Sequence, residues 1–154
     1  MDYLRFDRLV MTNLEKSLDK EILRTNRAGA YSSGTIVDCN TRKYHGLLVV
    51  PVENLGGNHV LLSSCDETLI QHGAELNIGL HKYAGDYYSP RGHKYIREFR
   101  LGAVSTTIYR IGGMILQKER IIVEGETRIM VAYTLLEAHS ATALRLRPFL
   151  AFRS

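Results

Sequence analysis

The chain has 154 residues, of which 45% are apolar and 23% charged, and its formal net charge is +4. This length suits one domain with a real core, and the composition excludes an intrinsically disordered chain. No apolar run approaches the roughly 20 residues of a membrane-spanning helix, and the N-terminus lacks the pattern of a secretory signal. We therefore expect no membrane partner. Because the chain has only two cysteines, we expect no disulfide framework and a reduced cytoplasmic setting.

The positive net charge raises the question of nucleic-acid binding. Basic residues are spread along the chain with acidic residues among them, and the only local concentration is the segment 91–97. A nucleic-acid-binding domain would gather its positive charge on one face, with aromatic side chains in between. We therefore expect no nucleic-acid partner.

The N-terminal segment combines a strand pattern with one helix signal. Residues 1–11 alternate loosely between apolar and polar and predict an edge strand. Thr12 and Glu15 have the spacing of a capping box, and Leu14 and Leu18 would share one helix face. These residues predict one short helix over about 14–20.

Beyond this helix the pattern is that of strands throughout. Gly112-Gly113 between two apolar runs is typical of a two-residue hairpin, and with the turn at 124–126 it predicts a meander of three long antiparallel strands. The predicted fold class is an all-β antiparallel sandwich with one short N-terminal helix. The candidate strands are 21–26, 30–38, 44–52, 59–66, 94–101, 104–111, 114–123, 127–137 and 142–152.

Two strands carry predictions about burial, and a third segment carries a prediction about a loop. The strand 127–137 is apolar on both faces, so we expect it to be covered on both sides or to lie centrally in a layered sandwich. The charged centre of the strand 114–123 is expected to reach solvent or another domain. Residues 77–95 lack alternation and predict a long loop, which is either functional, an interface, or an extended surface loop pinned by tyrosines.

The C-terminal strand 142–152 is apolar and runs to the last residues of the chain. An unpaired edge at such a strand invites association with another segment or another copy. We therefore expect this chain to be a fragment of a longer protein, and a homodimer formed through exposed strands stays open.

Pairs of carboxylates are the first candidates for acid–base catalysis. Asp66 and Glu67 are adjacent on a strand, so their side chains point to opposite faces and cannot flank one bond. Glu119, Glu124 and Glu126 lie at a turn or at an exposed position. All five are typical of solvated surface charges, and we expect no catalytic residue in this chain.

Metal and cofactor sites have no support in the sequence either. The histidines are scattered without the spacing of zinc ligands, and the two cysteines lie far apart. The glycines at 29, 34 and 46 are followed by strand pattern rather than by the helix of a dinucleotide-binding unit. We expect no metal and no cofactor.

The stretch 24–50 holds many polar side chains between two apolar runs, including Asn26, Arg42, Tyr44 and His45. If they are buried, each polar group needs a partner. One interpretation is an internal network in which Arg42 and Asn26 bond backbone groups and Tyr44 packs its ring. The other is a hydroxyl-rich ligand surface, where these side chains make directional contacts and an aromatic face packs on the ligand.

The same stretch resembles a known family. The order Glu21-x-Leu23-x-Thr25-Asn26-x-x-Gly29-x-Tyr31-x-Ser33-x-Thr35, followed by Asn40-Thr41-Arg42-x-Tyr44-His45-Gly46-Leu47-Leu48-Val49, resembles the N-terminal domain of the bacterial and archaeal glycogen debranching enzymes of the amylo-alpha-1,6-glucosidase type. Later segments agree with that family, so the resemblance runs from about residue 15 to the end.

The resemblance implies an N-terminal β-sandwich of the supersandwich kind, followed in the whole enzyme by an α/α-barrel with the catalytic carboxylates. This chain, residues 1–154, would be the first part of the sandwich and inactive alone. Its partners would be the enzyme's own catalytic domain and an α-glucan such as glycogen, cleaved at its alpha-1,6 branch points. A stand-alone glycan-binding sandwich and a structural or dimerisation module remain alternatives.

The resemblance also implies which residues face the barrel or reach the substrate channel. The candidates for this surface are Asn26, Tyr31, Thr41, Arg42, Tyr44 and His45, with Gly29 and Gly46 as structural glycines.

Overall fold

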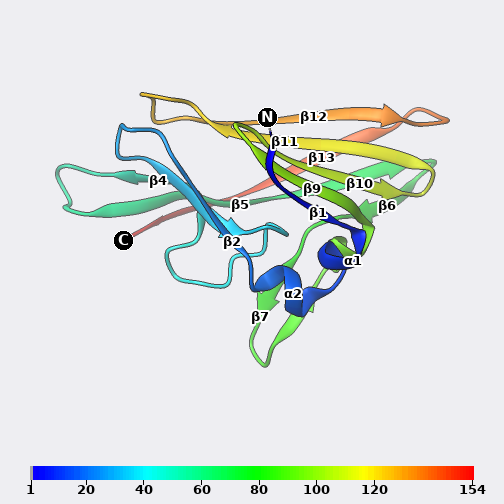
Figure 1. Ribbon diagram of the computed structural model, residues 1–154, viewed down its shortest axis with the longest axis horizontal. Helices are drawn as coiled ribbons and strands as arrows, with labels where there is room; N and C mark the ends of the chain where they lie inside the picture. Colours follow the sequence, from blue (N-terminus) through cyan, green and yellow to red (C-terminus); the bar gives the residue numbers. More distant parts are fainter. Residues whose placement is uncertain (1) are drawn as a thin grey trace.

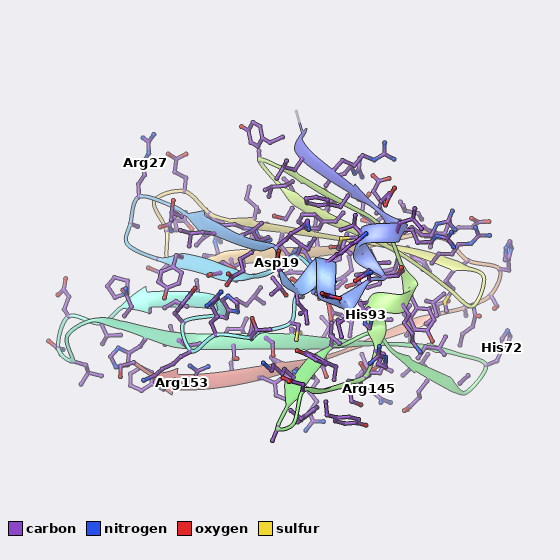
Figure 2. The ribbon with its side chains drawn as sticks, turned by 60° about the horizontal axis from the view of Figure 1, so that its bottom comes forward. Asp19, Arg27, His72, His93, Arg145 and Arg153 are labelled. Atoms are coloured by element: carbon purple, nitrogen blue, oxygen red, sulfur yellow. The ribbon has the colours of Figure 1, made fainter. Side chains whose placement is uncertain are left out.

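The computed structural model describes residues 2–154, which form two stacked antiparallel sheets and a separate small hairpin (Figures 1 and 2). The five-stranded sheet has the order β1 (Asp2–Asp7), β9 (Ile96–Gly102), β10 (Ser105–Ile111), β11 (Met114–Ile122), β12 (Ile129–Glu137). The six-stranded sheet has the order β13 (Ala143–Arg153), β5 (Asn58–Gln71), β4 (Gly46–Pro51), β3 (Tyr31–Thr35), β2 (Glu21–Thr25), with β6 (Ala74–Asn77) paired to β5. The predicted all-β antiparallel sandwich is confirmed.

Two short α-helices, rather than one, connect β1 to β2. They are α1 (Arg8–Met11) and α2 (Leu14–Leu18). The N-cap of α2 is Asn13, whose side chain accepts a hydrogen bond from the backbone N–H of Lys16 at 3.0 Å. Thr12, the predicted N-cap, is instead the C-cap of α1. Asparagine and threonine are both favoured at the N-cap, and the structure uses Asn13 rather than the preceding Thr12. In the described part of the chain, no helix is long and apolar enough to cross a membrane.

The predicted strands between residues 21 and 152 are all present, although β5 is longer than expected. Gly112 and Gly113 have positive φ angles and form a two-residue turn, with Ile111 paired to Met114. This confirms the predicted hairpin and, with β12 paired to β11, the meander. Met1, the first residue of the predicted N-terminal strand 1–11, lies outside the described residues. The strand ends at Asp7, and residues 8–11 form α1 instead.

The segment 77–95 is more ordered than the loop that the sequence predicts. It contains β7 (His81–Tyr83) and β8 (Tyr87–Ser89), which pair as a hairpin, and the 3-10 helix η1 (Gly92–Tyr95). The hairpin projects away from the two sheets (Figure 1). Each of these elements has only three or four residues, which is too short to give a periodic pattern in the sequence.

The prediction that the strand 127–137 is covered on both sides is wrong. This segment is β12, which is the last strand of its sheet. Met130 and Leu136 on its outer face are exposed. Exposed apolar residues on an edge strand are typical of a surface that binds a partner. The apolar pattern of β12 therefore marks an uncovered side of the sandwich rather than its centre.

The core between the sheets combines apolar packing with buried charge. Lys118 and Arg120 of β11 were expected near solvent, but both are buried, because alternation along β11 directs them inward together with Met114 and Leu116. The larger apolar cluster consists of Met11, Ile36, Val37, Cys39, Leu69, Ile78, Leu80, Ile96, Phe99, Tyr109, Ile111, Met114 and Leu116.

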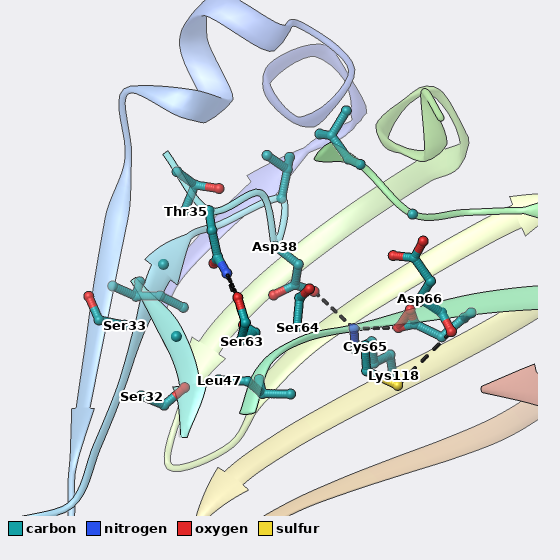
Figure 3. Close-up of a pocket in the computed structure, with 18 of the residues that line it drawn as sticks. Ser32, Ser33, Thr35, Asp38, Leu47, Ser63, Ser64, Cys65, Asp66 and Lys118 are labelled. Atoms are coloured by element: carbon teal, nitrogen blue, oxygen red, sulfur yellow. Dashed lines mark hydrogen bonds and ion pairs between the residues drawn. The ribbon is translucent and has the colours of Figure 1, made fainter. Parts of the chain in front are cut away.

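The acidic partners of Lys118 and Arg120 come from the other side of the core, from β5 and from the turn after β3. The Lys118 ammonium lies 3.1 Å from Asp38 Oδ2 and also contacts Glu67, which is itself buried and was wrongly expected to be a surface charge. Arg120 donates to Asp38 Oδ2 at 2.5 Å and to Thr107 at 2.6 Å. Figure 3 shows Lys118 directed toward Asp38. The two sheets are therefore joined by ion pairs as well as by apolar contacts.

Burial would raise the pKa of Asp38, but the positive charges of Arg120, Lys118 and Arg24 outweigh it and lower the pKa to about 2. Burial alone would lower the pKa of Lys118, whereas the charges of Asp38 and Glu67 raise it well above its usual value. Both groups are therefore ionised at neutral pH, and the contribution of Asp38 to stability is lost only as the pH falls below 4 toward 2.

Candidate functional site

A groove on the six-stranded sheet lies along β2 and β3 and has a volume of about 670 Å³. Arg24 of β2 points inward, since its Nε donates to Ser105 of the opposite sheet at 2.7 Å. The residues on either side of it in the sequence therefore face outward. The groove is formed by this outer face and by Tyr44, and its lining includes Glu21, Leu23, Thr25, Tyr31, Ser33 and Tyr44.

Two tyrosines frame the groove. Tyr31 lies on β3, directly across from Thr25 of β2, and is half-buried. Tyr44 precedes β4, and 52% of its surface is exposed. Its ring packs edge-on against the ring of His45, with centroids 5.2 Å apart. The exposed Leu23 also lines the groove. The groove thus offers an apolar and aromatic floor open to solvent.

Glu21 joins the first strand of the groove to the loop 41–45. Its Oε1 accepts a hydrogen bond from Arg42 Nε at 2.7 Å and lies 2.5 Å from His45 Nε2. The hydrogen bond from Arg42 lowers the pKa of Glu21; burial opposes this, and the hydrogen bond from His45 adds to it. The carboxylate is therefore ionised at neutral pH and holds the loop against β2.

His45 is fully buried and determines the shape of this loop. Its Nδ1 accepts hydrogen bonds from the backbone N–H groups of Thr41 and Arg42, at 3.0 and 3.2 Å. Because Nδ1 is the acceptor, the ring proton is on Nε2, which donates to Glu21. From the far end of β13, Arg153 donates to the Lys43 carbonyl at 3.0 Å. The position of Tyr44 is thus fixed from both sides.

Asn26 is buried beneath the turn between β2 and β3 and does not line the groove. Its side-chain amide donates to the carbonyls of Val123 and Glu126, and its oxygen accepts from the backbone N–H of Ala28 at 3.0 Å. These bonds join the β2–β3 turn to the β11–β12 turn of the other sheet. Asn26 therefore belongs to the internal network that the sequence left as one of two interpretations.

The remaining candidates lie around the groove in different roles. Thr41 is half-buried and contributes its backbone N–H to His45. Gly29 lines the groove with a φ of +88°, and a Cβ there would lie 3.1 Å from Pro51. A Cβ on Gly46 would lie 2.9 Å from a methyl group of Val49, so only glycine fits without displacement at this strand start.

A smaller cavity of about 40 Å³ lies between β3 and β5, next to Lys118 and Asp38 (Figure 3). Asn40, in the loop between β3 and β4, joins this loop to β5 by donating to the Ser63 carbonyl at 2.8 Å. This volume suits a few water molecules rather than a sugar ring. In the described part of the chain, no cluster of three or more His, Cys, Asp or Glu side chains could hold a metal ion.

Comparison with known proteins identifies the family of this sandwich. A family model described as glycogen debranching enzyme N terminal matches residues 20–154. The chain belongs to this family. No curated protein and no solved structure matches the chain. The family match covers the whole groove and both sheets, except for β1 and the two α-helices.

In this member of the glycogen debranching enzyme N-terminal family, the sequence candidates divide into two groups. Tyr31 and Tyr44 line the groove, whereas Asn26 and His45 are buried and do not line it. Glu21 connects the two groups but was not among the predicted site residues. The only sign of Glu21 in the sequence was that it begins the residue order that resembles the family. Its partners Arg42 and His45 lie more than 20 positions away along the chain.

Proposed function

We propose that this domain is a non-catalytic accessory domain of a glycogen debranching enzyme that cleaves alpha-1,6 branch points, and that its groove contacts the α-glucan. The observation that carries the proposal is the groove over β2 and β3 with Tyr31 and Tyr44 in its lining. Tyrosine faces pack on the C–H faces of sugars, while hydroxyl and carboxylate groups bind sugar hydroxyls. The volume of about 670 Å³ lies in the usual range of ligand sites.

The distribution of carboxylates supports a non-catalytic role. Glu21 is the one carboxylate among the described residues that line the groove. Most glycoside hydrolases use two carboxylates on either side of the bond that is cleaved. Asp38 and Glu67 are held by Lys118 in the core, and Asp66 lies 2.7 Å from His81. The chemistry of the parent enzyme is therefore assigned to its catalytic domain.

Replacing Tyr44 with Ala is expected to weaken the binding of maltoheptaose by about threefold to tenfold, because one aromatic wall of the groove is lost. Isothermal titration calorimetry of the chain with maltoheptaose measures this change. Tyr87→Ala is the matched control, since Tyr87 is also exposed but lies on the β7–β8 hairpin. Absence of binding by the wild-type chain, or equal losses in both variants, would contradict the proposed glucan contact.

We also propose that the open side of the sandwich contacts the catalytic domain of the same enzyme. Leu144, Leu146, Leu150 and Phe152 of β13 are exposed. Together with the exposed apolar residues of β12 they form an apolar surface along two strand edges, and such surfaces mark interaction sites.

Leu146→Glu is expected to weaken complex formation with the separately produced catalytic domain, because it places a charge on this apolar surface. Size-exclusion chromatography of the mixed domains measures complex formation, and Tyr83→Glu on the projecting hairpin is the control. The alternative is a homodimer through exposed strands. A dimer of the chain alone that excludes the catalytic domain and is lost in Leu146→Glu would favour that alternative.

A further inference from the structure

We propose that Glu21 is the residue that recognises the hydroxyl groups of the glucan, accepting hydrogen bonds through Oε2 from the neighbouring O2 and O3 hydroxyls of one glucosyl unit. Arg42 and His45 act as positioning residues that hold this carboxylate in place. The inference rests on the proposed glucan contact and adds the specificity of the site.

The two oxygens of Glu21 have different surroundings. Oε1 is occupied by Arg42 and His45, at 2.7 and 2.5 Å. No described residue donates a hydrogen bond to Oε2, although a carboxylate oxygen can accept two. The Glu21 side chain is 30% exposed and lines the groove. Its unoccupied oxygen is therefore available to a ligand in the groove.

The residues behind Glu21 leave it little freedom. His45 has no exposed surface, and both of its ring nitrogens are engaged, so the ring cannot turn without losing hydrogen bonds. Arg42 holds the same oxygen from the loop side. A carboxylate that is already fixed by two donors loses little conformational entropy when a ligand binds. Such an arrangement is characteristic of a preorganised binding site.

The charge state of Glu21 adds strength to the contact. The hydrogen bond from Arg42 lowers its pKa, so the carboxylate is ionised at neutral pH. Hydrogen bonds from hydroxyl groups to an ionised carboxylate are shorter and roughly twice as strong as those between neutral groups. The nearby tyrosines 31 and 44 would pack on the apolar faces of the sugar while Glu21 binds its hydroxyl edge.

The chemistry of glucans makes this contact selective for linkage. Glucosyl units joined through positions 1 and 4, or 1 and 6, keep both the O2 and O3 hydroxyls free. Units joined through positions 1 and 3 lose the O3 hydroxyl. A site that is built to bind a hydroxyl pair rejects a ligand that lacks one member, since the carboxylate oxygen is then left incompletely paired. The groove should therefore prefer α-1,4-linked chains to 1,3-linked chains.

The first test compares ligands on the wild-type chain. Maltoheptaose is expected to bind about tenfold or more tightly than laminariheptaose, whose internal units are β-1,3-linked, because one charge-assisted hydrogen bond is missing. Since the two ligands also differ in anomeric configuration, the inference further requires that this preference be lost in Glu21→Gln. Calorimetric titration with both oligosaccharides measures the ratio. Equal affinity for the two ligands would overturn the inference. This comparison requires no variant and so does not depend on how a variant folds.

The second test uses Glu21→Gln, which keeps the shape of the side chain but removes its charge. We expect maltoheptaose binding to weaken roughly 10- to 100-fold and the preference over laminariheptaose to disappear. Glu21→Asp, which keeps the charge but withdraws it from the groove, is expected to behave similarly. Arg42→Gln, which removes only a positioning residue, should weaken binding less and keep the linkage preference.

The outcomes separate this inference from the proposed function. If Tyr44→Ala weakens maltoheptaose binding but Glu21→Gln and Glu21→Asp do not, the glucan contact stands and the role of Glu21 is overturned. If the wild-type chain binds neither oligosaccharide, the proposed glucan contact falls and the inference falls with it. Thermal unfolding followed by circular dichroism establishes that each variant is folded at the temperature of the titration.

Discussion

Replacing Lys118 with Met is expected to lower the free energy of unfolding by about 3–5 kcal/mol, the range found when one partner of a buried ion pair is removed. Lys118 is 3% exposed and lies between Asp38 and Glu67. Without its ammonium group, the Glu67 side chain keeps, among residues 2–154, only the hydroxyl of Tyr133 as a donor, at 3.1 Å. Asp38 keeps Arg120, so Glu67 becomes the uncompensated buried charge.

Urea-induced unfolding of the wild-type chain and of Lys118→Met measures this loss. Lys43→Met, in the exposed part of the loop before β4, is the matched control and should change stability by less than about 0.5 kcal/mol. Adding Glu67→Leu to Lys118→Met should restore part of the stability, because both charges then leave the core together. A loss in Lys118→Met no larger than in the control would show that the inter-sheet ion pairs do not stabilise the fold.

Replacing Gly92 with Ala is expected to cost about 3 kcal/mol or more, at the upper end of what overpacking costs. A Cβ at this position would lie 1.9 Å from the carbonyl oxygen of Ile78 and 2.2 Å from its carbon. These are backbone atoms, which cannot turn away as the end of a side chain can. The backbone N–H of Gly92 also donates to the Gly79 carbonyl at 3.0 Å, and separating the two segments would break this bond.

Thermal unfolding followed by circular dichroism measures the effect of Gly92→Ala. Gly34→Ala is the matched control, because a Cβ there would lie 3.6 Å from Asn40 Oδ1, which is an ordinary contact. The control should unfold within a few degrees of the wild type. A Gly92→Ala variant as stable as the control would mean that η1 can move away from Ile78 at little cost.

Sequence patterns predicted the long elements because these elements carry their signal locally. The apolar alternation of β10 and β11 and the glycine pair between them specify a hairpin without reference to any distant residue. The pattern failed where burial depends on distant partners. Lys118 is buried because Asp38, 80 positions away, folds against it, and a charged residue in mid-strand is normally a sign of solvent.

The residues of the candidate groove were also predicted only in part, because some of them depend on contacts with distant residues. Tyr31 and Tyr44 were identified by the family resemblance, and both line the groove. The resemblance does not distinguish residues on the surface from residues beneath it, so the buried His45 was grouped with them. Glu21 requires the pairing of β2 with β3 and the loop 41–45 to be known, because only this arrangement brings its carboxylate to His45.

The pairing of β1 with β9 has a consequence for how the domain folds. Asp7 of β1 lies opposite Glu98, so the first strand of the chain must wait for a partner that is made about 90 residues later. In contrast, β2, β3, β4 and β5 follow one another and can form their sheet as the chain emerges. Contacts between residues so far apart slow folding to milliseconds or longer. The β2–β5 part of the six-stranded sheet, which carries the groove, would thus be formed before the five-stranded sheet that covers its inner face and before β13 joins its edge.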